Sequence, residues 1–444
     1  MIYWIFNILI IIWAGIIVYD FKRGYLLTMC AYIVFPHFIR FQIGSLGFAW
    51  VDVISLVLLI SFLLKREILT KGIKYPLLLK KFFYFDIIST FLLILFSSGY
   101  VPYNIQVVSF LKYILQNVSF MIIGFYAFHN INKSLAYNIL FIVSSVCGIY
   151  GIISYIIGSN PYINLLYLLY TGSDNIYLNF QEEVRGVLEG RVSGTNVHPL
   201  GWGQMWNVLL FFYFLVRKKC SEWLGYCVLP IGVINIVLCG SRSALVGFLV
   251  FILLYVMSNG VLKVLKYALS ILLLLMLMLS LTQHVRGLRT FQNYLEASVL
   301  FWDRERQNDA DIRGSSADMR ITQFKKAIEI ASKNPSGLGY SFKLYSLNHY
   351  SRYNDYLYGL ESFVLRRLIE QGVGGLFCFT IVFTYISKYF LSGIKKRKTY
   401  LHCACVMFCY LLCVFMTDMQ GISWLLLISM IILYKSVPQN CLKY

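Results

Sequence analysis

Long apolar runs repeat along this chain from end to end, and they decide which fold class it can adopt. Uninterrupted apolarity favours helices over strands, because a backbone exposed to lipid must satisfy its own hydrogen bonds. A helix needs about 20 apolar residues to cross the roughly 30 Å of hydrocarbon in a bilayer. Thirteen runs reach or approach that length: 2–19, 24–40, 46–64, 82–99, 105–128, 135–158, 199–216, 222–239, 243–258, 262–282, 363–391, 400–416 and 420–434. The sequence therefore predicts an all-α polytopic membrane protein with about 12–13 transmembrane helices.

The charged residues are few and unevenly distributed. Only 13% of the residues are charged, against about 25% in a soluble domain, yet the net charge is +19. Lys and Arg gather in every second connection, as at 65–81 and 395–398, which is the positive-inside pattern rather than a polyanion-binding patch. We therefore expect no nucleic-acid partner, a cytoplasmic C-terminus and, with thirteen spans, an outer N-terminus.

The same alternation divides the chain into three parts. Residues 1–282 carry spans one to ten, with short loops and an outer loop at 159–198. Residues 283–360 form a long extracytoplasmic loop, and residues 361–444 carry the last three spans. The long loop is too short for an ordinary independent domain, so we expect a helical cap that lies on the membrane surface.

One segment of the long loop has the pattern of an amphipathic helix. Ser315 followed by Asp318 gives an S-x-x-D start, and Asn334-Pro335 gives a stop. Apolar residues recur between them at helical spacing, namely Ile321, Phe324, Ile328 and Ala331. The segment is therefore predicted to be a helix with one apolar stripe.

Arginines stand out in the outward connections. Arg185 and Arg191 precede the seventh span, and Arg242 lies in the turn "GSRS" between two spans. Arg320 lies in the first turn of the loop helix, where the helix dipole disfavours a cation. Plainer interpretations stay open, because Arg242 can snorkel to the headgroups and Arg320 can form a surface ion pair with a nearby acid.

The start of the eleventh span adds an acid and two more arginines. Glu361 lies at the outer mouth of this span, where it is either a general base or simply an acid favoured by the helix dipole. Arg366 and Glu370 are four residues apart and are expected to pair along the helix. Arg367 would then point elsewhere.

Arginines and one carboxylate suit the transfer of a sugar from a lipid pyrophosphate. The departing pyrophosphate gains negative charge, and guanidinium groups match phosphate geometry and stay charged in poorly solvated sites. A carboxylate can take the proton of the acceptor hydroxyl. The eleven Cys lie mostly in apolar runs without zinc-ligand spacing, so we expect neither a metal nor another cofactor.

Three segments resemble conserved pieces of the bacterial O-antigen ligase and Wzy-type polymerase superfamily. They read "CGSRSALVGF", "MRITQFKKAIEIASKNPSGLGYSF" and "ESFVLRRLIEQGVGGLFCF", and "GRVSGTNVHPLGWGQ" is a looser fit upstream. Together they extend from about Gly190 to Phe379. Where the ligases have His-Asn, this chain has Glu361-Ser362, which favours a polymerase over a ligase.

The resemblance implies a GT-C-like helical membrane fold, a metal-independent inverting transfer, and roles for individual residues. It assigns the general base to Glu361, with His349 as the second choice. It assigns pyrophosphate contact most clearly to Arg242, Arg320 and Arg191 and less clearly to Arg185, Arg366 and Arg367. Contacts to the sugar or donor are predicted for Ser241, Ser243 and Tyr340. Single aromatic residues such as Trp202, Trp206 and Tyr345 are of a type that stacks on sugars, although packing is the plainer role.

The implied enzyme is a polymerase of O-antigen or capsule type in the bacterial cytoplasmic (inner) membrane, with its site facing the periplasm. Its partners would be undecaprenyl-pyrophosphate-linked glycans and membrane lipids, with a chain-length regulator and a flippase as further candidates. A ligase that transfers the glycan to lipid A core or protein is the first alternative. A transporter of lipid-linked sugars is the second. It would use ionisable residues deep in the spans, such as Asp52, Asp86 and Lys112, and Asp52 and Lys112 are candidates to pair across helices.

Overall fold

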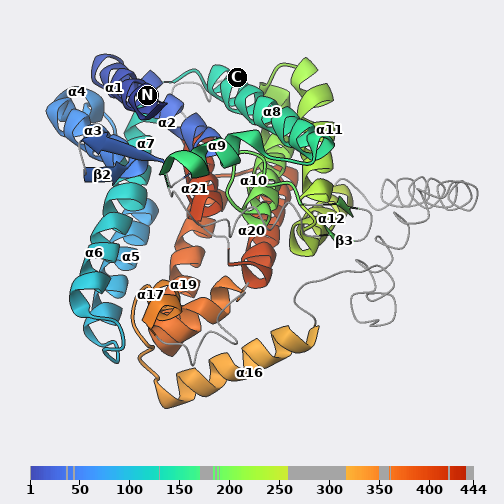
Figure 1. The fold of residues 1–444 in the computed structure, drawn as a ribbon. Coiled ribbons are helices and arrows are strands. Elements are labelled where there is room, and N and C mark those ends of the chain that lie inside the picture. The colour runs from blue at the N-terminus through green and yellow to red at the C-terminus, as the bar shows by residue number, and fades with distance from the viewer. Residues whose placement is uncertain are drawn as a thin grey trace, which may run out of the picture.

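The apolar runs form helices that pack side by side into one bundle, as the computed structural model in Figure 1 shows. The structure describes residues 2–36, 39–43, 46–129, 131–170, 184–185, 188–189, 191–258, 317–349, 360, 362–418 and 421–436. The prediction of an all-α polytopic membrane protein is confirmed.

The helices before the first long outer loop are α1 (Ile2–Tyr19), α2 (Phe21–Val34), α3 (Trp50–Leu64), α4 (Arg66–Thr70), α5 (Leu77–Leu95), α6 (Tyr103–Tyr113), α7 (Phe120–Phe128), α8 (Lys133–Ile157) and α9 (Pro161–Tyr170). Those that follow are α10 (Pro199–Val216), α11 (Trp223–Leu238), α12 (Arg242–Met257), α16 (Ala317–Lys333), α17 (Phe342–His349), α19 (Phe363–Leu391), α20 (Arg397–Met416) and α21 (Gly421–Lys435). A π-helical turn, Ile114–Ser119, joins α6 to α7 in one continuous helix, and a 3-10 turn, Arg217–Lys219, follows α10.

Twelve of the thirteen predicted spans coincide with described helices, and the run 262–282 lies outside the described residues. Within the described part of the chain, four helices are long and apolar enough by themselves to cross a membrane: Tyr103–Phe128, Lys133–Ile157, Phe363–Leu391 and Arg397–Met416. Five shorter apolar helices accompany them.

The second and third runs are shorter as helices than predicted. Helix α2 ends at Val34, two residues before Pro36, which cannot donate a helical hydrogen bond. The next apolar residues form an antiparallel hairpin of β1 (Arg40–Ile43) and β2 (Leu46–Ala49). A second, two-residue hairpin pairs β3 (Val184–Arg185) with β4 (Leu188–Glu189).

Helix α10 forms the centre of the bundle. Nearly all of its side chains are buried, and Trp202 and Trp206 are fully enclosed, so these two indoles belong to the core rather than to a surface that a sugar could reach. Gly203 lets this helix approach the start of α12, because a Cβ there would lie 2.9 Å from the Ala244 methyl group. The centre of the fold therefore sets where α12 begins.

Connections predicted to lie on the outer side contact one another. The Thr195 hydroxyl donates to the carbonyl of Ile33 at the end of α2 (2.6 Å), and the Asn160 amide donates to the carbonyl of Gly194 (2.7 Å). Farther along the chain, the Ser98 hydroxyl donates to the carbonyl of Gly337 (2.6 Å). The first two contacts join the connection before α10 to the end of α2, and the third joins the connection after α5 to the loop after α16.

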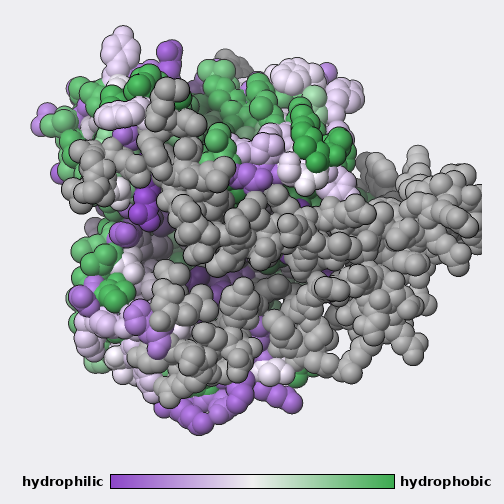
Figure 2. All heavy atoms as spheres, viewed as in Figure 1, coloured by the Kyte–Doolittle hydropathy of each residue, from purple (hydrophilic) through white to green (hydrophobic). Residues whose placement is uncertain are grey.

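Helix α16 runs along the lower edge of the bundle in Figure 1, beside α17 and α19, and Figure 2 shows hydrophilic side chains along this edge. It ends at Lys333, as predicted from Asn334-Pro335. Its buried face includes Ala327 and Ile330, which pack in a second small core with residues of α19. The predicted stripe is only partly correct, because Ile321, Phe324 and Ile328 are about half exposed, whereas Ala331 is buried.

Candidate functional site

The first group of site residues surrounds the turn between α11 and α12. Arg191 is 5% exposed, and its Nε donates to the carbonyl of Cys239 (3.1 Å). The backbone N–H of Val192 donates to Leu238 (3.0 Å), so the chain runs beside the end of α11. Gly240 has φ of 61°, and a Cβ there would lie 3.4 Å from Arg191 Cγ and Nε. The positive φ of this turn therefore favours glycine, and the Arg191 side chain packs directly against it.

Two serines shape the start of α12. Ser241 is its N-cap, and the Ser241 hydroxyl accepts from the N–H of Ala244 (3.3 Å). The hydroxyls of Ser241 and Ser243 lie 3.0 Å apart. Arg242 is the first residue of the helix, where the dipole favours anions rather than cations. A guanidinium and a helix N-terminus at one point are the elements of an anion-binding site.

The second group is built where the long loop docks onto α19. Helix α19 is interrupted at Gly372, which has φ of 64° and ψ of −162°, a conformation open essentially to glycine alone. The interruption frees the carbonyls of Ile369 and Glu370, which accept instead from the N–H groups of Leu338 and Gly339 (2.9 Å each). Backbone from the loop thus completes the hydrogen bonds of a broken helix.

Gly337, in the loop after α16, and Gly372, in α19, let the two segments approach each other closely at this junction. A Cβ on Gly337 would lie 2.5 Å from the carbonyl oxygen of Glu370, and a Cβ on Gly372 would overlap the Pro335 carbonyl. The segments "NPSGLG" and "EQGVGG" are therefore two halves of one contact. This contact fixes the loop that follows α16 against the first turns of α19.

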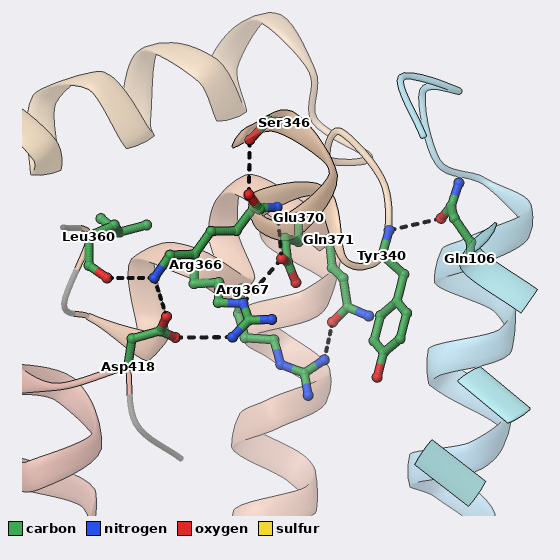
Figure 3. A network of polar contacts seen from close by, with 10 residues as sticks. Gln106, Tyr340, Ser346, Leu360, Arg366, Arg367, Glu370, Gln371 and Asp418 are labelled. Carbon is green, nitrogen blue, oxygen red and sulfur yellow. Dashed lines mark hydrogen bonds and ion pairs between the residues drawn. The ribbon is translucent and has the colours of Figure 1, made fainter. Parts of the chain in front are cut away.

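A network of four charged side chains lies beside the junction (Figure 3). Arg366 Nε donates to Glu370 Oε1 (3.1 Å), which confirms the predicted pair, and Arg366 Nη1 donates to Asp418 Oδ1 (3.4 Å). Lys343 Nζ binds Asp418 Oδ2 (2.5 Å) and the carbonyl of Leu360 (2.8 Å). The Glu370 and Asp418 side chains are only 5% and 7% exposed. Two cations therefore neutralise two buried acids.

Arg367 points away from this network, as predicted. Its Nη1 donates to Gln371 Oε1, and its guanidinium lies 5.0 Å from the centre of the Phe363 ring. Tyr340 is held near the same turn by a hydrogen bond from its N–H to Gln106 Oε1 (2.8 Å), and Figure 3 shows its ring beside Gln371. Burial raises the pKa of the Tyr340 phenol, so this hydroxyl stays protonated and is suited to donate to a ligand.

The two groups lie at a similar depth on neighbouring helices. The Asn207 amide donates to the carbonyl of Ala244 on α12 (3.0 Å) and lies 3.6 Å from Cys413 Sγ on α20. Arg242 lies two residues outward from Ala244, and Asp418 lies five residues outward from Cys413. With a rise of about 1.5 Å per residue, Arg242 lies about 3 Å beyond Ala244, and Met416, which ends α20 two residues before Asp418, lies about 4.5 Å beyond Cys413. The N–H of Phe363 also donates to the carbonyl of Thr417 (3.3 Å), which places the start of α19 at the same end.

The remaining predicted residues are placed less completely. Arg320 lies in the first turn of α16 and Arg185 lies in β3. Glu361 lies outside the described residues. His349 ends α17, is exposed, and stacks on Tyr345 with the ring centres 4.0 Å apart.

Two charged residues of the network were absent from the sequence-based prediction. Lys343 and Asp418 are 75 residues apart and carry no motif that would single them out. The transporter hypothesis proposed a pair between Asp52 and Lys112, but Asp52 Oδ1 accepts from the Gln116 amide (2.5 Å). Gln116 lies in the π-helical turn, which the apolar pattern of the run did not reveal.

Residues 227–380, about a third of the chain, match the family model described as O-antigen ligase. The match confirms the resemblance to the O-antigen ligase and Wzy-type superfamily. It includes the turn at Gly240, helix α16 and the docked contact at Gly372, and it ends before Asp418. A search of curated proteins and a search of solved structures found no match. The family supports a function of the O-antigen ligase or polymerase type, carried out by a multi-pass membrane protein.

Proposed function

We propose that this protein is a polymerase of bacterial surface polysaccharide, of the O-antigen or capsule type. It would join oligosaccharide repeat units carried on undecaprenyl pyrophosphate, at the periplasmic face of the cytoplasmic membrane. One observation carries the proposal: Arg191 is buried against Gly240, two residues before Arg242, which starts α12. Arg191 reaches this turn from a distant part of the chain, because its acceptor Cys239 is 48 residues away in the sequence. Burying a guanidinium in a membrane protein is unfavourable, and binding of a pyrophosphate offers a reason to keep it there.

The reaction would be a direct displacement. A hydroxyl oxygen at the non-reducing end of one repeat unit attacks the anomeric carbon of the growing glycan, and the bond from that carbon to the phosphate oxygen breaks. The hydroxyl proton passes to Glu361, and the charge left on undecaprenyl pyrophosphate is stabilised by Arg191, Arg242 and Arg320. Attack from the opposite face inverts the anomeric centre.

The other candidate residues support this assignment in smaller ways. Arg185 and Arg367 are further pyrophosphate contacts, and Ser241, Ser243 and Tyr340 are donors for sugar or phosphate oxygens. His349 is the second choice for the base, since its exposed ring already stacks on Tyr345 and its Nδ1 lies 2.9 Å from the Tyr345 carbonyl. A flippase would supply the substrate, and a chain-length regulator would act on the product.

A ligase is the main alternative, and it would differ only in the acceptor. Purified protein is incubated with a defined undecaprenyl-pyrophosphate repeat unit, and the glycan is resolved by size. A ladder of products is expected. Product that forms only after addition of lipid A core or an acceptor protein would indicate a ligase, and movement of the lipid across a vesicle membrane without any new bond would indicate a transporter.

Substitutions test the assigned residues in the same assay. Arg242→Ala is expected to lower kcat/KM by about 100-fold, as does the loss of one charge-stabilising donor in other enzymes. Arg320→Ala and Glu361→Ala should act similarly, and Arg242→Lys should remain poor because an ammonium lacks the planar fork. Lys218→Ala is the matched control, because Lys218 is an exposed cation in the 3-10 turn after α10. Wild-type ladders from Arg242→Ala, Arg320→Ala and Glu361→Ala alike would refute the site.

A further inference from the structure

A small polar cavity lies inside the bundle, behind the face of α19 that carries Arg367. It is lined by Asp86 and Thr90 of α5, by Tyr113 of α6 and by Arg367 and Gln371 of α19. Its free space is about 20 Å³, and a polar cavity of roughly 10–15 Å³ already holds one water molecule. The cavity is therefore large enough for a water and too small for a sugar or a phosphate.

Asp86 is held in this cavity at the middle of α5. It is 7% exposed, and its Oδ2 accepts a 2.6 Å hydrogen bond from the Tyr113 hydroxyl. Tyr113 is the last residue before the π-helical turn, a kind of irregularity that is often found at functional sites. A buried carboxyl group is unfavourable unless a partner compensates it.

Gln371 provides the second observation at the same cavity. It is 2% exposed, and its Oε1 accepts from Arg367. Its Nε2 is buried and has no acceptor among the described residues. An amide donor that faces a polar cavity beside a carboxylate is the arrangement in which a water bridges donor and acid.

We propose that Asp86 is the positioning residue for Arg367 and acts across this cavity through a bridging water. Gln371 binds one side of the guanidinium, and Asp86 supplies the countercharge from the neighbouring helix. Together they would hold the Arg367 guanidinium in a fixed orientation, although the partner on its own helix is a neutral amide. This inference rests on the proposed function only for the ligand that Arg367 then meets, the pyrophosphate of the lipid-linked glycan.

The chain contains a matched control for the role of Asp86. Asp52 is also an acid in a span, and its Oδ1 also accepts from a side chain of the helix Tyr103–Phe128, namely Gln116. It does not line the cavity. If Asp86→Asn has an effect that Asp52→Asn lacks, that effect is therefore due to the lost interaction with Arg367 rather than to the loss of an acid from an apolar helix.

A double-mutant cycle tests the pairing without reference to the substrate. The unfolding midpoints of full-length protein in lipid nanodiscs are compared for Asp86→Asn, Arg367→Gln and the double variant. If the two charges interact, the double variant should lose clearly less than the sum of the two single shifts. Additive shifts would overturn the inference. If Asp86→Asn does not accumulate, Tyr113→Phe takes its place, because it removes only the hydrogen bond that orients Asp86.

Kinetics then test the positioning role. Asp86→Asn should raise KM for the lipid-linked repeat unit by about tenfold, as do other substitutions behind a contacting residue, and Asp86→Glu should restore most of that loss. Asp52→Asn should leave KM unchanged. A coupled pair with an unchanged KM would refute the positioning role. A wild-type protein that makes no ladder would refute the proposed function, while the unfolding cycle would still decide the pairing.

Discussion

Two neighbouring arginines at the start of α19 have very different surroundings, although their spacing to a partner is the same. Arg366 has Glu370 one turn along the helix, and Arg367 has Gln371 at the same offset. The first acceptor is charged and the second is neutral. The helix therefore neutralises Arg366 by itself, whereas Arg367 needs a countercharge from elsewhere.

The partners from other segments of the chain also differ between the two arginines. On the face of Arg366, Asp418 and Lys343 extend the pair into a network that joins α17, α19 and the segment that follows α20. On the face of Arg367, the acid that lines the shared cavity is Asp86 of α5. A charge-balanced network suits a structural role, because its acids and cations already occupy one another. An arginine with a neutral acceptor on its own helix keeps more capacity to bind an added anion.

The largest effect on both faces is expected from Gly372→Ala. The alanine would adopt a backbone conformation open essentially to glycine, which costs of the order of 3 kcal/mol, and its Cβ would overlap the Pro335 carbonyl. The docked loop should detach from α19, and the protein should lose both its ladder and its resistance to heating in detergent. Gly393→Ala is the control, since Gly393 also has a positive φ but faces open space. Equal losses from both variants would show that the docked contact is unimportant.

A smaller effect is expected from Glu370→Gln, which gives Arg366 the same neutral partner as Arg367. Removing one acid of a buried pair destabilises by about 3–5 kcal/mol, and the partial exposure of Arg366 should reduce this to about 2 kcal/mol. Chemical unfolding of the purified protein measures the change. No change in stability would mean that Asp418 alone satisfies both cations.

An exposed acid provides the control for that substitution. Lys326 and Lys333 both hydrogen-bond Glu329 on α16 and hold the pKa of its carboxyl at about 2. Because these pairs are exposed to solvent, Glu329→Gln should leave stability unchanged within error at neutral pH. A loss as large as that of Glu370→Gln would contradict the role assigned to burial.

The local part of this arrangement could be predicted from the sequence. Apolar periodicity predicted the spans, the four-residue spacing predicted the pair of Arg366 and Glu370, and Asn334-Pro335 predicted the end of α16. Each of these features depends on residues within a few turns of one another. The turn that carries Arg242 was also predicted, because "GSRS" separates two apolar runs.

The partners that come from distant segments could not be predicted in this way. Lys343 meets Asp418 across 75 residues, and Asp86 shares a cavity with Arg367 from a helix of the first half. Hydrophobic periodicity shows which side of a helix is apolar but not which helix lies against it. Pro36 explains a further difference, because it ends α2 earlier than the apolar run suggested.

The smallest expected effect comes from Gln371→Glu, which gives Arg367 the charged partner that Arg366 has. The new acid would lie one turn along α19 and could replace the countercharge of Asp86. In an Asp86→Asn background it should therefore recover about 1 kcal/mol of the lost substrate binding, or roughly fivefold in KM. In the wild-type background it should lower activity, because Arg367 would be held as firmly as Arg366 and would bind an anion less well. The two backgrounds are compared in one ladder assay. If Gln371→Glu leaves activity unchanged in both wild-type and Asp86→Asn protein, the charge of the acceptor does not control Arg367. The contrast between the two faces would then have no functional meaning.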